Sequence, residues 1–222
     1  SLLGTIRTYV GGPGAQALQG LLVPLDVLGF IAIATLLGRM PGQLLQKILG
    51  SVVFPAFSKT RREAPERLDT LLLRMRLALL AVTVPLFFGL ALFAQPIVDL
   101  LYDPRYAAAG FIMALLLAED AIASLSAPYQ NLMLAEGNSP LHALVMAFWA
   151  VARTVGIFAG FALAGVFGML VGMAIGSTLM LMLSTGLAWR RDYATKLLDV
   201  AALAICGAFY AYIALGLEMP AG

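Results

Sequence analysis

Long, almost continuous runs of apolar residues alternate with short polar stretches along this chain. Most runs reach the roughly 20 residues that a helix needs to cross the hydrocarbon core of a bilayer. They lack the strict alternation of apolar and polar side chains that is typical of a membrane β-barrel. We therefore predict about seven membrane-spanning helices, at residues 2–23, 28–57, 71–94, 107–134, 141–163, 167–189 and 197–216.

Proline and glycine interrupt several of these helices. A Gly-Gly-Pro-Gly sequence at 11–14 weakens the first, while Pro41, Pro85 and Pro128 lie inside the second, third and fourth. A proline within a helix removes one backbone hydrogen bond, so it commonly marks a kink or a break. We expect such irregularities near all three.

The composition agrees with a polytopic membrane protein. Hydrophobic residues make up 61% of the 222 residues and charged residues 12%, whereas soluble domains carry about 25% charged residues. The linkers are too short for a separate soluble domain, so residues 1–222 are predicted to form one all-α transmembrane domain. The single cysteine, Cys206, is interpreted as inert packing.

The longest charged stretch is residues 58–70, Ser-Lys-Thr-Arg-Arg-Glu-Ala-Pro-Glu-Arg-Leu-Asp-Thr. Short cytoplasmic loops of membrane proteins are enriched in Lys and Arg. On the face that bears this stretch we count nine basic residues, against only Arg105 on the other: Lys59, Arg61, Arg62, Arg67, Arg74, Arg76, Arg190, Arg191 and Lys196. The segment 58–70 is therefore predicted to be a solvated cytoplasmic basic loop that records topology.

Three predicted helices carry polar side chains on one face. Arg39, Gln43, Gln46, Lys47 and Gly50 lie on the second, Glu119, Asp120, Ser124, Ser126, Gln130 and Asn131 on the fourth, and His142, Trp149 and Arg153 on the fifth. Polar groups inside a membrane are costly and normally face a cavity or a partner. The pattern predicts a polar interior with cations from two helices and carboxylates from a third.

One interpretation of this interior is a hydrated cavity for an anionic, polyhydroxylated ligand. Arg and Lys bind phosphate, and amide side chains bind sugar hydroxyls. The candidate binding residues are Lys47, Arg153, Arg39, Gln43, Gln46, Gln130 and Asn131. Glu119 and Asp120 are candidates for taking up a coupling proton, because neighbouring carboxylates at low dielectric favour holding one.

A purely structural interpretation remains open beside the functional one. Arg39 could extend to the membrane interface, Arg153 could pair with Glu119 or Asp120, and the amides could tie helices together. The structural interpretation is favoured for Arg39 and for His142, whereas Lys47 and Arg153 lie deeper in their helices.

A ladder of glycines follows these polar residues: Gly156, Gly160, Gly168, Gly172 and Gly176. Small residues at every fourth position allow two membrane helices to approach closely. We expect close helix packing at this ladder.

No sequence motif for catalysis or for a cofactor occurs. The chain lacks His-Glu metal spacing, a CxxC pair, a Gly-x-Ser-x-Gly turn and a phosphate-binding loop. We expect neither an enzyme nor a cofactor or nucleic-acid partner.

Three ordered stretches resemble a known family. These are residues 28–34 (Leu-Gly-Phe-Ile-Ala-Ile-Ala) with Pro41 and 53–59 (Val-Phe-Pro-Ala-Phe-Ser-Lys), residues 97–109, and the turn at 134–139 (Leu-Ala-Glu-Gly-Asn-Ser). Together they resemble the polysaccharide flippases of the multidrug/oligosaccharidyl-lipid/polysaccharide exporter superfamily, over about residues 14–192. The chain departs from the family pattern at Phe30 or Ile31, where Tyr is usual, at Asp103, where Gly is usual, and near Gln16, where a charged residue is often found.

The resemblance implies one lobe, plus one extra helix, of a two-lobed flippase, so the chain would be the second half of a transporter with 12–14 helices. It implies transport of an undecaprenyl-pyrophosphate-linked oligosaccharide, such as an O-antigen, capsule or exopolysaccharide unit, across the bacterial inner membrane by alternating access. The implied partners are membrane lipid, the polyprenyl-pyrophosphate-linked glycan, the N-terminal half of the same protein and glycan polymerase machinery.

Three alternatives stay open. A cation-coupled multidrug exporter of the same superfamily should have a more acidic interior. A membrane-embedded polyprenyl-phosphate transferase would need acidic residues or histidine at a loop boundary, where only Asp99 and Asp103 stand. A non-catalytic assembly subunit is the third.

Overall fold

The computed structural model describes residues 20–189 and 196–216, and every regular element in them is helical, which confirms the predicted all-α fold. The α-helices are α3 (Leu25–Ile48), α4 (Phe54–Glu63), α5 (Leu68–Thr83), α6 (Gly89–Leu92), α7 (Ala94–Leu101), α8 (Ala108–Leu125), α9 (Ala127–Ala135), α10 (Ser139–Trp189) and α11 (Lys196–Gly216). The first predicted helix, with Gln16, lies almost entirely outside the described residues.

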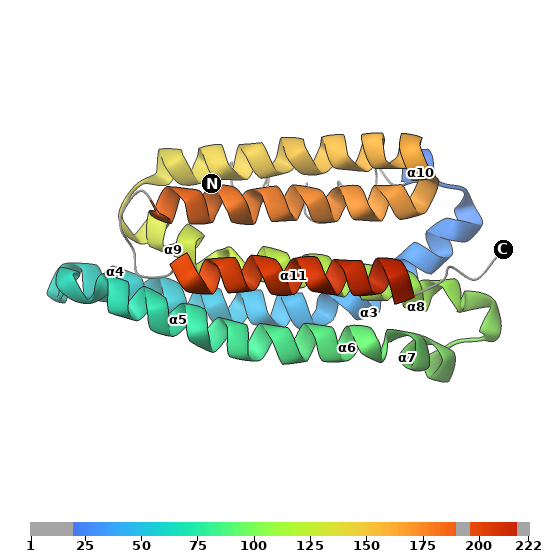
Figure 1. Cartoon of the computed structure of the whole chain (residues 1–222), viewed down its shortest axis with the longest axis horizontal. Coiled ribbons are helices and arrows are strands. Elements are labelled where there is room, and N and C mark those ends of the chain that lie inside the picture. The colour runs from blue at the N-terminus through green and yellow to red at the C-terminus, as the bar shows by residue number, and fades with distance from the viewer. Residues whose placement is uncertain (1–19, 190–195, 217–222) are drawn as a thin grey trace.

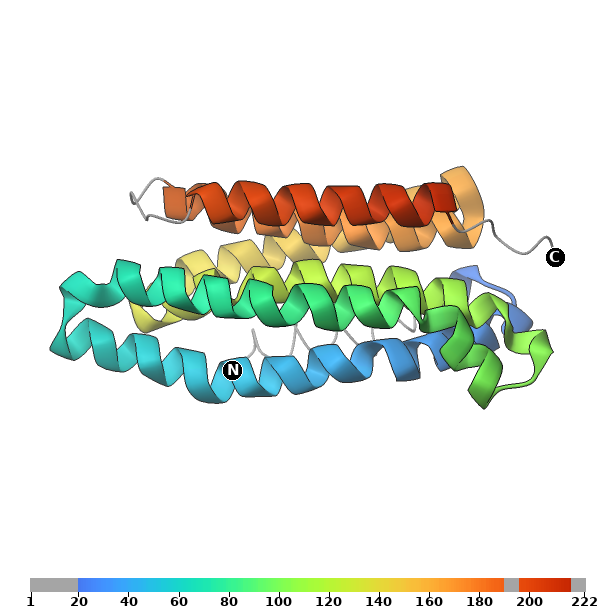
Figure 2. The ribbon, with the colours of Figure 1, turned by 60° about the horizontal axis from the view of Figure 1, so that its bottom comes forward.

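The helices run roughly side by side along one elongated bundle (Figure 1). Seen from a second direction, α11 and part of α10 lie on one side, α3 and α4 on the other, and α8 with α5 between them (Figure 2). In the apolar window of 108–135, 83% of residues are buried, against 22–28% in the other long apolar helices. The segment α8–α9 is therefore the centre of the bundle.

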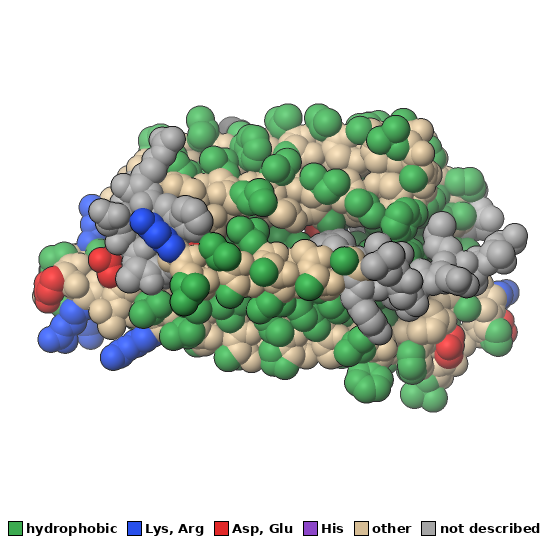
Figure 3. Space-filling model, viewed as in Figure 1, with side chains coloured by type: hydrophobic (Ala, Val, Ile, Leu, Met, Phe, Trp, Pro, Cys, Tyr) green, Lys and Arg blue, Asp and Glu red, His purple; other side chains and the backbone are tan. Residues whose placement is uncertain are grey.

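Four helical segments in the described part of the chain are long and apolar enough to cross a membrane: 27–63, 65–92, 108–135 and 139–187. This finding supports the predicted membrane class, while the count of seven spanning helices stays a prediction. Apolar side chains cover much of the face drawn in Figure 3. The large exposed apolar residues include Leu144, Val151 and Val155 on α10. Such a surface is expected for helices that face lipid rather than water.

Two of the expected proline irregularities are found, whereas the helix at the third continues. Pro85 lies in η3 (Val84–Phe88), a π-helical turn that joins α5 to α6. Ser126 separates α8 from α9 two residues before Pro128. Around Pro41, α3 remains helical, and a second π-helical turn, η1 (Leu49–Val53), precedes Pro55. Proline has no N–H group to donate to the helix, and a π-helical turn has i→i+5 hydrogen bonds. Both therefore interrupt the regular α-helical hydrogen-bond pattern.

The basic segment 58–70 is mainly helical, which differs from the expected loop. Helix α4 continues to Glu63, a short 3₁₀ helix covers Pro65–Arg67, and α5 begins at Leu68. Lys and Arg are good helix formers, and basic residues in the last turn of α4 interact favourably with its carbonyl end. The segment is a helical corner whose bend falls at Ala64, where the backbone leaves the helical conformation (φ −154°, ψ 68°).

Helix α10 combines the fifth and sixth predicted helices. The chain reverses at Ala164 and Gly165, and Gly165 has a φ of 58°, in the left-handed region that glycine adopts without strain. Two antiparallel parts result, before and after this reversal (Figure 1). A Cβ atom on Gly156 would collide with the backbone of Gly172, and one on Gly160 with that of Gly168. The expected close approach at the glycine ladder is confirmed.

This contact predicts how two glycines in the second part of α10 respond to one methyl group. Gly172→Ala should lower the thermal unfolding midpoint of the purified protein, because a methyl group has no room against the Gly156 backbone; overpacking typically costs about 1–3 kcal/mol. Gly186→Ala is the matched control, since no atom lies within 4 Å of its Cβ position. The control should stay at or slightly above wild type. Equal midpoints for both variants would contradict the close approach.

Candidate functional site

Glu119, on the central helix α8, is the hub of a charge network made with Arg39, Asp120 and Arg153. Its side chain is 2% exposed. Arg153, from the first part of α10, donates through Nη1 to Oε1 and through Nη2 to Oε2, the latter at 3.3 Å. Arg39, from α3, donates to Glu119 Oε2 at 3.2 Å and to Asp120 Oδ1 at 3.4 Å. The network therefore joins three helices.

The second part of α10 completes the surroundings of Glu119. Ser177 Oγ donates to Glu119 Oε1 at 3.1 Å, and Trp149 Nε1 donates to Ser177 Oγ at 3.5 Å. The guanidinium carbon of Arg153 lies 5.4 Å from the centre of the Trp149 ring, a cation–π arrangement. Arg153 and Glu119 are thus held by both parts of the α10 hairpin.

The charge network is balanced and has one open side. Its two arginines face two carboxylates, as burial in low dielectric requires. Arg39 and Asp120 remain 17% and 14% exposed, whereas Glu119 and Arg153 are 2% exposed. Asp120 packs against α3 at Gly42, where a Cβ atom would lie only 2.6 Å from Asp120 Oδ2. A ligand would reach the Arg39–Asp120 side first.

The other candidates on α3 differ from Arg39 in their exposure. Gln43 and Lys47 are exposed, and Gln46 is half-buried. Gln43 lines a pocket of about 490 Å³ along α3. The other described lining residues are mostly apolar: Leu28, Ile31, Ala32, Thr35, Leu36 and Met40. Arg39, one turn before Gln43, turns inward to the carboxylates of α8 instead of extending to the interface.

The amides of α9 hold neighbouring groups of the bundle. Gln130 Nε2 donates to Ser126 Oγ at 2.8 Å and contacts Met180 Sδ at 3.6 Å, which links α9 to α10. Asn131 Nδ2 donates to the carbonyl of Ala127 at 3.0 Å. His142 lies in the first turn of α10, eleven residues or about 16 Å along the helix from Arg153. These residues are not part of the charge network.

The sequence interpretation missed a second buried ion pair. Arg76 on α5 and Asp199 on α11 are both 0% exposed and bonded to each other. Arg76 was counted among the nine basic residues on the face that bears segment 58–70, together with Arg74. Sequence position is the signal that could have identified the pair. Arg76 lies two residues further into an apolar run than Arg74, and Asp199 also lies within an apolar run. Charges so placed need a buried partner.

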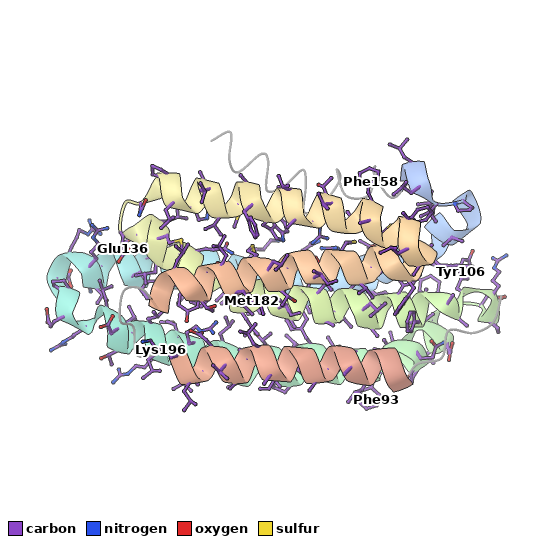
Figure 4. All side chains as sticks on the ribbon, turned by 45° about the horizontal axis from the view of Figure 1, so that its top comes forward. Phe93, Tyr106, Glu136, Phe158, Met182 and Lys196 are labelled. Atoms are coloured by element: carbon purple, nitrogen blue, oxygen red, sulfur yellow. The ribbon has the colours of Figure 1, made fainter. Side chains whose placement is uncertain are left out.

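Charged side chains gather at the two ends of the bundle in the view of Figure 3. Lys and Arg side chains gather where α4 meets α5 (Figure 3), and Glu136 and Lys196 lie at that same end (Figure 4). Tyr106 lies at the opposite end (Figure 4), next to Asp103, which caps the 3₁₀ helix Pro104–Tyr106 by accepting from Arg105 N at 3.1 Å. The predicted basic face and external turn are therefore at opposite ends of the bundle.

Fold and site together define an α-helical membrane bundle with a buried, balanced charge network. Residues 14–111 match the family model described as "Polysaccharide biosynthesis protein", which confirms the predicted resemblance over that segment. The match includes Arg39, Gln43 and Lys47 on α3 and ends before Glu119 and Arg153. No curated protein and no solved structure matches the chain.

The charge network predicts strong coupling between Arg153 and Glu119. Arg153→Met leaves a buried carboxylate short of a partner, and removing one member of a buried pair typically costs about 3–5 kcal/mol. Arg153→Met combined with Glu119→Gln should be more stable than Arg153→Met alone, because the uncompensated charge is gone. Thermal unfolding midpoints in one detergent measure both effects.

Arg67→Met is the matched control, since Arg67 is exposed and lies 4.0 Å from Glu66. Exposed pairs contribute about 0–1 kcal/mol, so this variant should keep nearly the wild-type midpoint. Strictly additive effects of the Arg153 and Glu119 substitutions would contradict the coupling.

Proposed function

We propose that the protein is a flippase and not an enzyme. It moves an undecaprenyl-pyrophosphate-linked oligosaccharide across the bacterial inner membrane by alternating access, with the basic end of the bundle in the cytoplasm. The family match over residues 14–111 supports a role in polysaccharide biosynthesis. The apolar helices of membrane-spanning length support a place in the bilayer.

Lys47 carries the proposal. It is exposed, and it lies near the middle of the 37-residue apolar segment 27–63. An ammonium group at this depth is costly in lipid, so such a residue normally faces water, a polar partner or an anionic ligand. Gln43 is exposed one turn away. This face of α3 therefore suits a polar ligand inside the membrane, and the pyrophosphate of a lipid-linked glycan has the charge that Lys47 would bind.

The charge network offers a way to couple proton uptake to ligand binding. While Glu119 and Asp120 are ionised, Arg39 is held by both carboxylates. A proton on either carboxylate would weaken its bond to Arg39, and a pyrophosphate could then compete for the guanidinium. Ligand binding and proton uptake at the exposed side of the network would in this way favour the same state.

The alternatives fit less well. A drug exporter with an acidic interior would need carboxylates available to a cation, but Glu119 and Asp120 are each bonded to an arginine. For a transferase, Asp99 and Asp103 are the acidic pair at a loop boundary. Asp99 accepts from Gln95 at 2.9 Å, and Asp103 caps a 3₁₀ helix. Both have local structural roles.

Lys47→Ala in the full-length protein tests the proposal. At wild-type protein abundance, we expect a loss of surface glycan, because the ligand's negative charge loses its partner. Lys59→Ala is the control: Lys59 is an exposed lysine at the basic end with only a local ion pair to Glu63 at 3.8 Å. It should keep surface glycan. Wild-type glycan in the Lys47 variant would refute the assignment of this face.

The proposed orientation has its own test. A single cysteine at Lys59 in a Cys206→Ser background should react with a membrane-impermeant thiol reagent only after the inner membrane is opened. A cysteine at Arg105, which is exposed at the opposite end, should react in intact spheroplasts. The reverse pattern would show that the basic end faces outward.

A further inference from the structure

Arg76, Tyr129 and Asp199 form a second buried polar cluster, outside the charge network. They come from α5, α9 and α11, and each is at most 1% exposed. Arg76 Nη2 donates to Asp199 Oδ1, and the Tyr129 hydroxyl lies 2.6 Å from both carboxylate oxygens of Asp199. The guanidinium also lies over the Tyr129 ring, 4.7 Å from its centre. We call these three residues the Arg76 cluster.

The Arg76 cluster is built on the break between α8 and α9. Arg76 Nη1 donates to the carbonyl of Leu125, the last residue of α8. Carbonyls at a helix end need a partner from outside the helix, and α8 ends at Leu125. Tyr129 lies on the other side of the break, in α9. One guanidinium thus holds the end of α8 while the same cluster holds the start of α9.

The cluster also attaches α11 to the bundle. Most of the described side chains of α11 are exposed, and Asp199 and Ala202 are its buried ones. Further along α11, the Phe209 ring stacks on Phe88 at 3.9 Å between centres. Asp199 is therefore a buried polar attachment of this helix, and it is bonded to Arg76, which also bonds to the end of α8.

We propose that Arg76 is a positioning residue: with Tyr129 and Asp199 it holds the α8–α9 break in its observed geometry. Glu119 and Asp120 lie on α8 one to two turns before Leu125, so the direction of α8 at the break sets their position against Arg39 and Arg153. A movement of α9 or α11 must exchange these bonds. Polar elements with two arrangements can couple distant parts of a protein in this way.

Hydrogen exchange measured by mass spectrometry on the purified full-length protein tests the proposal without requiring transport. Arg76→Lys keeps the charge but removes the forked geometry that reaches both Leu125 and Asp199. We expect amide exchange in 121–135 to become faster by roughly two- to thirtyfold, the range of such coupling energies. Exchange in the distant glycine hairpin, 156–172, should stay at the wild-type rate.

Two controls keep the test specific. Arg74→Lys makes the same change at an exposed position of α5, and it should leave 121–135 unchanged. Tyr129→Phe removes only a hydroxyl and should give a smaller, local increase. It also serves if Arg76→Lys fails to fold. Tyr102→Phe is the control for Tyr129→Phe. It removes a hydroxyl from a half-buried tyrosine outside the cluster and should leave amide exchange in 121–135 unchanged.

The possible results separate cleanly. Exchange in 121–135 that matches the Arg74→Lys control, or that rises equally throughout the bundle, would overturn the proposal. The link to transport rests on the proposed function: at equal abundance, Arg76→Lys should also reduce surface glycan. Faster exchange at the break with wild-type glycan would overturn the claim that the break positions the site. Wild-type glycan in the Lys47→Ala variant would instead count against the proposed function and leave the exchange result intact.

Discussion

A buried carboxylate on the central helix is the constraint on which the arrangement of the bundle depends. Glu119 is 2% exposed, and an unpaired charge at that position would be very costly. Its partners come from helices on both sides: Arg39 on α3 and Arg153 on α10. Satisfying this one group therefore specifies which faces of three helices point inward.

Close packing around the charge network depends on residues with no side chain. Gly42 makes room for Asp120, and a Cβ atom on Gly176 would lie 2.9 Å from the Cα of Arg153. Gly156 and Gly172 bring the two parts of α10 into backbone contact, so that Trp149 and Ser177 can meet beside Glu119. Polar pairing and glycine packing thus act together: the glycines set the distances over which the charged groups bond.

The polar residues that the sequence placed on three helix faces have different roles in the structure. Glu119, Asp120, Arg39 and Arg153 meet in one network, while Gln130 and Asn131 bond within or beside α9. Gln43 and Lys47 stay exposed. Helical periodicity alone could place these residues on a face, but it could not distinguish a face that meets another helix from a face that remains open. That difference depends on which helix lies alongside.

The sequence by itself determined the all-α class, the long helices after residue 24 to within several residues, and the close approach at the glycine ladder, because these follow from local apolar runs and from spacing along one helix. It did not predict the short helix α7, which lies between two predicted spanning helices. Only the tertiary structure decided that Arg76 is buried while Arg74 is exposed, and that Asp199 is the partner of Arg76. Arg76 and Asp199 are 123 residues apart, and their bond exists because α5 and α11 pack at the same helix break. Local patterns show that a membrane charge needs a partner, but only the packing of distant helices shows which partner it has.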